Sequence, residues 1–138
     1  MLNELKTLHG ALREAIAELA AETAKAEPDA ATLPLVRLKL TRASSRRKAL
    51  IECSISPLLH DVSPEDARRI EDLRRIAADK AVLSSAHIAR WTMRLILADW
   101  QGYRRASADM RAQMLRRINE EAAILYPLLE AKEARKAA

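Results

Sequence analysis

Two stretches of the sequence place charged side chains on what should be the buried side of a leucine-rich helix. The segment "RRINEEAAILYPLLEA" at 116–131 carries Arg117 and Glu121 one helical turn apart. A weaker copy, "RRKALIECSISPLLHD" at 46–61, carries Arg47 at the matching position. A guanidinium offers only hydrogen-bond donors and keeps its charge, so neither arginine can ligate a metal, and each repels a cation nearby.

Two histidines are predicted to lie beside these charges. His9 shares a helix face with Leu5 and therefore faces inward. Counting ~1.5 Å of rise per residue from the first expected helix–helix turn places His9 level with Arg47. The same count from the second turn places His87 level with Arg117. Each hairpin is therefore predicted to set one histidine opposite one arginine in the middle of the protein.

These residues predict a polar centre held by ion pairs. Arg47 and Arg117 are expected to pair with Glu121 and to donate to a neutral histidine nitrogen, with Glu52 as a reserve partner for Arg47. An unpartnered buried charge costs several kcal/mol, so Arg117→Leu is expected to strand Glu121 and destabilise by ~3 to 5 kcal/mol. The alternative is that the arginines extend to the surface and the histidines are ordinary core residues.

The elements that position these residues are predicted from apolar spacing and helix caps. Apolar residues recur every three or four positions in every major segment, and no strand pattern competes. Ser63 and Pro64 predict a helix start, and Gly102 predicts a helix end. The expected helices cover 2–26, 32–58, 64–78, 84–100, and a last one from between 103 and 107 to about 132. This predicts an all-α, antiparallel up-and-down four-helix bundle with an extra connecting helix between the second and third long helices.

Composition supports one helical domain. The apolar content is mostly Ala, Leu and Ile, with only 2 Gly and no Phe, which favours helix. The length suits a single domain, predicted over 1–132, with a frayed tail at 133–138. No apolar run approaches the ~20 residues of a membrane span, so a soluble cytoplasmic protein without membrane association is expected. Cys53 has no cysteine to pair with and is expected to be inert packing.

The charge distribution leaves two kinds of partner open. The net charge is +5, and the stretch 37–48 contains six Lys and Arg residues with no acidic residue. An acidic protein or nucleic acid could bind such a stretch, but it lacks the interleaved aromatic residues that would favour nucleic acid. The sequence identifies no protein partner and does not determine the oligomeric state.

The chain resembles the hemerythrin-like, or HHE cation-binding, family. The resemblance is carried by His9, by "IECSISPLL", by "HIARW" with "LADWQGY" after it, and by "RRINEEAAILYPLLE". Its most specific element is the E-x-x-x-x-Y-P-L-L pattern that begins at Glu121. The resemblance implies an antiparallel four-helix bundle in which inward histidines and carboxylates hold a non-haem di-iron centre, and members that bind oxygen or nitric oxide or sense iron.

Carried over position by position, the resemblance implies a degenerate di-iron site. The ligand positions that keep a metal-binding residue are His9, His87 and Glu121. The ligand positions that have lost one are Arg47, Ile51, Trp91 and Arg117. The resemblance therefore favours a non-catalytic binding or regulatory module without a cofactor.

Two alternatives keep other functions open. The three retained residues form a two-histidine, one-carboxylate set, which in other scaffolds holds a mononuclear iron, so non-haem iron or zinc is the alternative cofactor, for oxygen, nitric oxide or iron sensing. A basic-patch module that binds an acidic protein or nucleic acid is the second alternative. No phosphate loop, nucleophile elbow or CxxC motif is present, so no catalytic residue is predicted.

Overall fold

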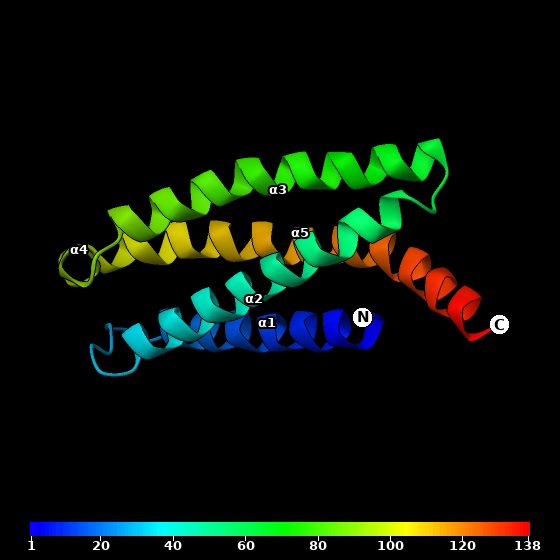
Figure 1. The fold of residues 1–138 in the computed structure, drawn as a ribbon. Coiled ribbons are helices and arrows are strands. Elements are labelled where there is room, and N and C mark those ends of the chain that lie inside the picture. The colour runs from blue at the N-terminus through cyan, green and yellow to red at the C-terminus, as the bar shows by residue number, and fades with distance from the viewer.

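The protein is entirely helical. The computed structural model describes residues 1–138 and contains no strand (Figure 1). Its helices are α1 (Leu2–Thr23), α2 (Leu33–Leu59), α3 (Pro64–Arg90), α4 (Met93–Ala98) and α5 (Trp100–Ala137). The predicted all-α class is confirmed.

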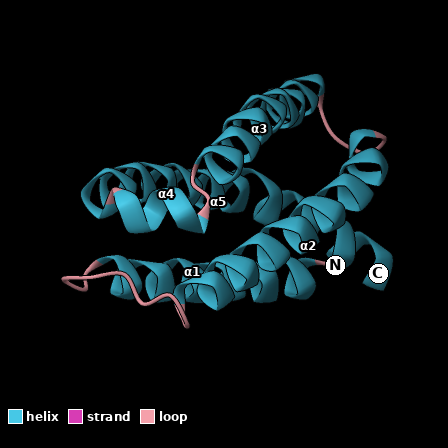
Figure 2. Cartoon of the chain, turned by 90° about the vertical axis from the view of Figure 1, so that its left-hand side faces the viewer, coloured by secondary structure: helices cyan, strands magenta, loops and turns pink.

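The four long helices pack unevenly. α1 packs against α2 and α5, whereas α3 packs against α5 and touches α2 little. α5 lies between α3 and α1, and α2 starts beside α1 and inclines toward the beginning of α3 (Figure 1). Short loops join the helices, and the longest of them links α1 to α2 (Figure 2). The two helical hairpins therefore separate where α2 begins and α3 ends.

Side-chain caps set three of the helix starts. Ser63 Oγ accepts from the Asp66 backbone N–H at 3.1 Å, which confirms the predicted start of α3. Thr92 Oγ1 accepts from the backbone N–H of Leu95 at 3.3 Å and begins α4. Asp99 Oδ1 accepts from the Gly102 backbone N–H at 3.0 Å and begins α5. Each cap satisfies a backbone donor that has no partner inside its helix.

The predicted helix break between residues 78 and 84 is wrong. One helix, α3, runs through Ser84 and Ser85 to Arg90, because no proline or glycine interrupts it. The break falls at Trp91, whose φ of −92° and ψ of 73° leave the helical region. Gly102, predicted to end a helix, lies in the first turn of α5, where an added Cβ would collide with the Asp99 carboxylate.

Three smaller expectations also change. Residues 133–137, expected to be frayed, continue α5, and Glu133 Oε1 accepts from the Leu2 backbone N–H at 3.0 Å. α1 ends at Thr23 rather than at residue 26. Cys53, expected in packing, is exposed. None of the five helices is both long and apolar enough to span a bilayer.

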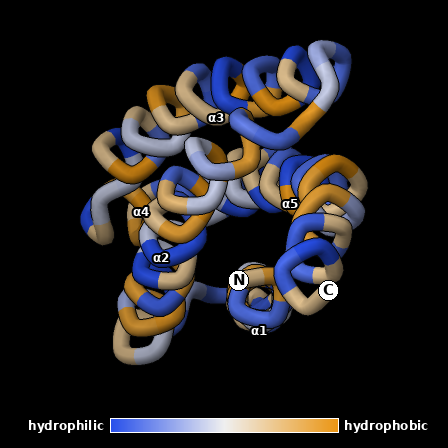
Figure 3. The backbone as a smooth tube through the Cα atoms, turned by 45° about the vertical axis from the view of Figure 1, so that its right-hand side comes forward, coloured by the Kyte–Doolittle hydropathy of each residue, from blue (hydrophilic) through white to orange (hydrophobic).

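The apolar core consists of two clusters with a polar layer between them. Hydrophobic and hydrophilic residues alternate within the turns of the helices, as expected when each helix buries one face (Figure 3). The larger cluster includes Leu12, Leu19, Leu40, Trp100, Tyr103 and Ile118, and the smaller includes Leu5, Ile55, Leu58, Ile70, Leu125 and Leu129. Between the clusters lie three buried charged residues and one buried histidine, which together are called the polar layer: Arg47, Arg117, Glu121 and His9.

Candidate binding site

The polar layer is organised around the carboxylate of Glu121. His9 Nε2 lies 3.3 Å from Glu121 Oε1, and Arg47 Nη1 lies 3.7 Å from the same oxygen. His9 Nδ1 lies 2.6 Å from the Tyr126 hydroxyl. In the neutral tautomer Tyr126 donates to His9 Nδ1 and the Nε2 proton faces Glu121, but His9 Nε2 and Glu121 Oε1 are both buried without a hydrogen-bond partner. The predicted convergence of His9, Arg47 and Glu121 is therefore present.

Local helix geometry explains the convergence. His9 lies one turn from Leu5 and Leu12 on the buried stripe of α1 and has no exposed surface. Glu121 and Tyr126 both lie on α5, so one helix supplies both partners of His9. Burial raises the pKa of Tyr126 and the charge of Glu121 raises it further, while Arg13 opposes them. Tyr126 therefore stays a neutral donor.

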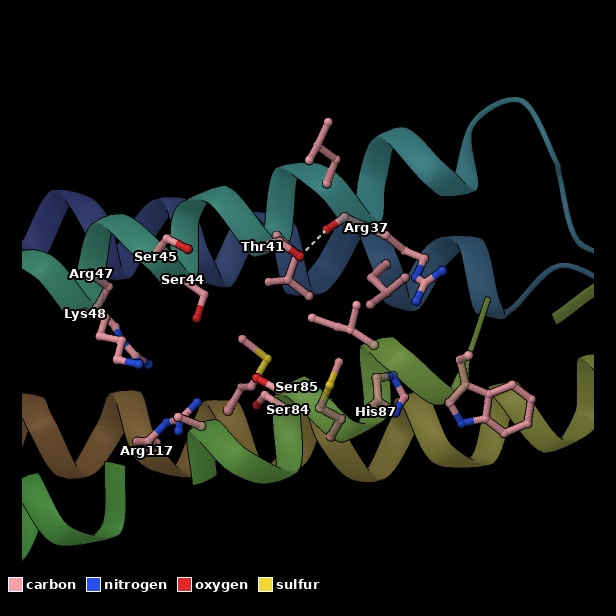
Figure 4. Close-up of a pocket in the computed structure, with 18 of the residues that line it drawn as sticks. Arg37, Thr41, Ser44, Ser45, Arg47, Lys48, Ser84, Ser85, His87 and Arg117 are labelled. Atoms are coloured by element: carbon pink, nitrogen blue, oxygen red, sulfur yellow. Dashed lines mark hydrogen bonds between the residues drawn. The ribbon is translucent and has the colours of Figure 1, made fainter. Parts of the chain in front are cut away.

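Arg117 differs from the prediction. It is buried, yet it reaches ion-pair distance of no carboxylate, and Arg47 rather than Arg117 contacts Glu121. Arg117 Nε and Arg47 Nε and Nη1 are buried without a hydrogen-bond partner. Burial lowers the pKa of Arg117, and the nearby Arg47 lowers it further, against a smaller opposing effect of Glu121. The two guanidinium groups point toward the same space (Figure 4).

The sequence predicted that His87 lies level with Arg117, and the structure shows that it does not. Its ring stacks near that of Tyr103, with centroids 6.1 Å apart, and Tyr103 is ~21 Å before Arg117 along α5 at 1.5 Å per residue. The early break at Trp91 moves the hairpin, so the level counted from Trp100 is wrong. Burial lowers the pKa of His87, and the charge of Arg37 lowers it further.

The other residues that the resemblance marked as metal-ligand positions lie apart from this cluster. Ile51 packs against the smaller apolar cluster, and Trp91 is buried at the end of α3. Glu52 Oε2 lies 3.9 Å from Arg74 Nη2, so Glu52 pairs with Arg74 and not with Arg47. No three His, Cys, Asp or Glu side chains gather where one metal ion could be held. His87 is thus separated from His9 and Glu121, so the three residues that the resemblance marked as retained ligands do not converge on one point.

A pocket of about 550 Å³ opens between α2, α3 and α5, beside the polar layer (Figure 4). This volume lies within the ~300 to 1,000 Å³ typical of small-molecule sites. Small residues on one face of α3 make room for it, namely Ala77, Ala81, Ser84 and Ser85. These four small residues recur at helical spacing in the sequence. Because a helix break was predicted at residues 79–83, they were not assigned to one face of one helix.

The pocket is positively charged. Its lining includes Arg37, Arg47, Lys48 and Arg117 and contains no Asp or Glu. Serine and threonine hydroxyls from α2 and α3 lie between Arg37 at one end of the pocket and Arg47 and Arg117 at the other. Figure 4 shows Thr41, Ser44, Ser84 and Ser85 among them. Hydroxyls can donate or accept, whereas the guanidinium groups only donate. The lining therefore combines positive charge with hydrogen-bond donors.

Comparison with known proteins identifies no relative. No protein-family model, no curated protein and no solved structure matches the chain. The function must therefore be inferred from the geometry of the site.

Proposed function

We propose that this protein is a non-catalytic binding module whose ligand is a small anion held in the pocket between α2, α3 and α5. The observation that carries the proposal is the pair of buried guanidinium groups, Arg47 and Arg117, that line a pocket without any carboxylate. Glu121 is the only buried acidic residue, so one positive charge in the layer lacks a counter-charge. A bound anion would supply it through charge-assisted hydrogen bonds.

The chemistry of the lining favours binding over catalysis. His87 is the only pocket residue whose side chain ordinarily titrates near neutral pH. Its Nε2 atom has no hydrogen-bond partner, and no carboxylate orients its ring. The pocket therefore lacks the carboxylate that would orient His87 as a base for a serine.

A small ligand is also favoured over a macromolecule at the basic stretch of α2. Lys39 is paired with Glu18 at 2.7 Å, and Arg37 and Arg47 turn into the pocket. Fewer free cations are then left on the surface for phosphates or for an acidic protein. An acidic protein that binds the exposed Arg42 and Arg46 is the second candidate, with less support.

The proposal includes an origin for the site. The four long helices would be an up-and-down bundle of the hemerythrin-like kind, in which Arg47 and Arg117 stand where metal ligands once stood. The convergence of His9, Arg47 and Glu121 supports this origin. In this view the guanidinium groups supply the positive charge that the metal supplied, in a cytoplasmic regulatory protein.

Titration calorimetry with acetate, inorganic phosphate and decanoate tests the proposal. At least one anion should bind wild type, and a ligand at 100 times its Kd should raise the free energy of unfolding by about 2.7 kcal/mol. Arg117→Met should abolish binding, whereas Arg116→Met, which removes the same charge from the exposed neighbouring position, should preserve it. Failure of all three anions to bind, or equal binding by Arg117→Met, would contradict the proposed function.

A further inference from the structure

The two ends of the pocket differ in how their charges are engaged. Arg47, Lys48 and Arg117 gather at one end (Figure 4). Arg37 lies at the other end, where its guanidinium sits 5.5 Å from the centroid of the Tyr103 ring. That cation–π contact engages the charge of Arg37 within the protein. The free positive charge is therefore concentrated at the end that contains Arg117.

An apolar surface also lines the pocket between its ends, beside the hydroxyls of α2 and α3. Leu40, Met110 and Met114 contribute side chains from α2 and α5. Leu38 and Ile88 line the opening and are 44% and 47% exposed. Methionine side chains are flexible and adapt to ligands of varied shape. A compact oxyanion at the Arg117 end would leave this surface in contact with water.

The pocket is also elongated. Arg37 and Arg47 line its two ends and are separated by ten residues of α2, which is ~15 Å at 1.5 Å per residue. Trp91 and Tyr103 lie at the Arg37 end, next to His87. A ligand that fills the pocket must therefore be long and narrow, with its charge at one end.

We infer that the ligand is a single-chain amphiphile, whose anionic head binds Arg47 and Arg117 and whose apolar chain lies along Met114 and Met110 toward Trp91. The inference rests on the proposed anion-binding function and adds the ligand class. A carboxylate and a phosphate monoester head share the chemistry that a guanidinium pair recognises. The chain contributes the apolar contact that a bare oxyanion lacks.

Chain length provides the first test. Each methylene that becomes buried should strengthen binding about three- to fourfold, so decanoate should bind on the order of a hundredfold more tightly than hexanoate. Decanoate and decyl phosphate distinguish the two head groups, and decanol, which lacks the charge, should bind far more weakly than either. Equal affinities for acetate, phosphate and decanoate would overturn the amphiphile while leaving Arg117-dependent anion binding intact. Absence of all binding would overturn both proposals.

Tryptophan fluorescence provides the second test. Trp91 lines the pocket and Trp100 does not, so Trp91 is the nearer emitter to a bound chain. Bromine quenches tryptophan at short range, and 10-bromodecanoate should quench wild-type emission more than 2-bromodecanoate. Trp91→Phe should reduce the difference, because the remaining Trp100 stacks on Tyr103 at the same end but does not line the pocket. Stronger quenching by the 2-bromo isomer would place the head at the Trp91 end and overturn the orientation.

A substitution in the wall separates chain binding from head binding. Ala81→Leu narrows the pocket, whereas Ala78→Leu makes the same change at an exposed position of α3. Ala81→Leu should keep acetate binding and lose most of the gain from hexanoate to decanoate, while Ala78→Leu should match wild type. Circular dichroism establishes that each variant is folded. An unchanged chain-length series in folded Ala81→Leu would contradict a chain seated in this pocket.

Discussion

Replacement of Glu121 by glutamine should destabilise the protein strongly, because Glu121 is the only buried acidic residue. Its Oε1 atom lies 3.7 Å from Arg47 Nη1, and Coulomb's law with an effective dielectric constant of ~20 assigns about 4 kcal/mol to unit charges at that separation. Removal of one partner of a buried ion pair typically costs ~3 to 5 kcal/mol. Glutamine preserves the side-chain volume, so no cavity contributes. We therefore expect Glu121→Gln to lower the free energy of unfolding by ~3 to 5 kcal/mol.

Urea denaturation followed by circular dichroism measures this loss as a lower midpoint with an unchanged slope. Glu120→Gln removes the same charge from the exposed neighbouring position and should change stability by less than ~0.5 kcal/mol. The double variant Arg47→Met/Glu121→Leu removes both charges and should recover much of the loss, because no unpaired partner of that ion pair remains. A midpoint for Glu121→Gln equal to that of Glu120→Gln would refute the buried pair.

Three further predictions concern Arg117, His87 and the metal content of the protein. Arg117→Met should leave the free energy of unfolding unchanged or raise it by up to ~1 kcal/mol. Burial and Arg47 lower the pKa of Arg117, so its charge opposes folding. A loss of ~3 kcal/mol in urea denaturation would instead support the direct pairing of Arg117 with Glu121 that the sequence predicted. Burial and Arg37 hold the pKa of His87 below its usual 6.5, so the unfolded chain binds more protons and the free energy of unfolding should fall as the pH drops below that value. In His87→Gln, urea midpoints measured from pH ~7 to ~5 should depend less on pH than in wild type. An unchanged pH profile would contradict the lowered pKa of His87. Protein expressed with added iron and zinc should contain no stoichiometric metal in elemental analysis, since His87 lies apart from His9 and Glu121; bound iron with histidine–iron absorption bands would contradict that expectation.

Helix starts and the break differ in how readily the sequence predicts them. Ser63 and Pro64 predicted the start of α3, because a hydroxyl cap and a proline at the first position act locally. The break at Trp91 was missed, although Thr92 and Asp99 are both suitable cap residues. Gly102 is a stop signal when the sequence is read alone, and only the Asp99 cap shows that it lies in the first turn of a new helix.

The polar layer was predicted in part for a related reason. His9, Arg47 and Glu121 meet as expected, because both the face and the level of each residue follow from helical periodicity and a correctly placed first hairpin. His87 was misplaced because its level was counted from a hairpin that closes elsewhere. A displaced turn shifts every predicted contact across that hairpin by 1.5 Å per residue.

The sequence by itself determined the helical class and which charged residues face inward, because spacing and caps act within one helix. Only the tertiary structure decided that Arg47 rather than Arg117 contacts Glu121, since that choice depends on how α2 packs against α5. The same holds for the pocket. It exists because α3 rests on α5 while α2 rests on α1, and the small residues of α3 leave the space between them unfilled. Such a separation depends on the packing of several helices together, and no single segment specifies it.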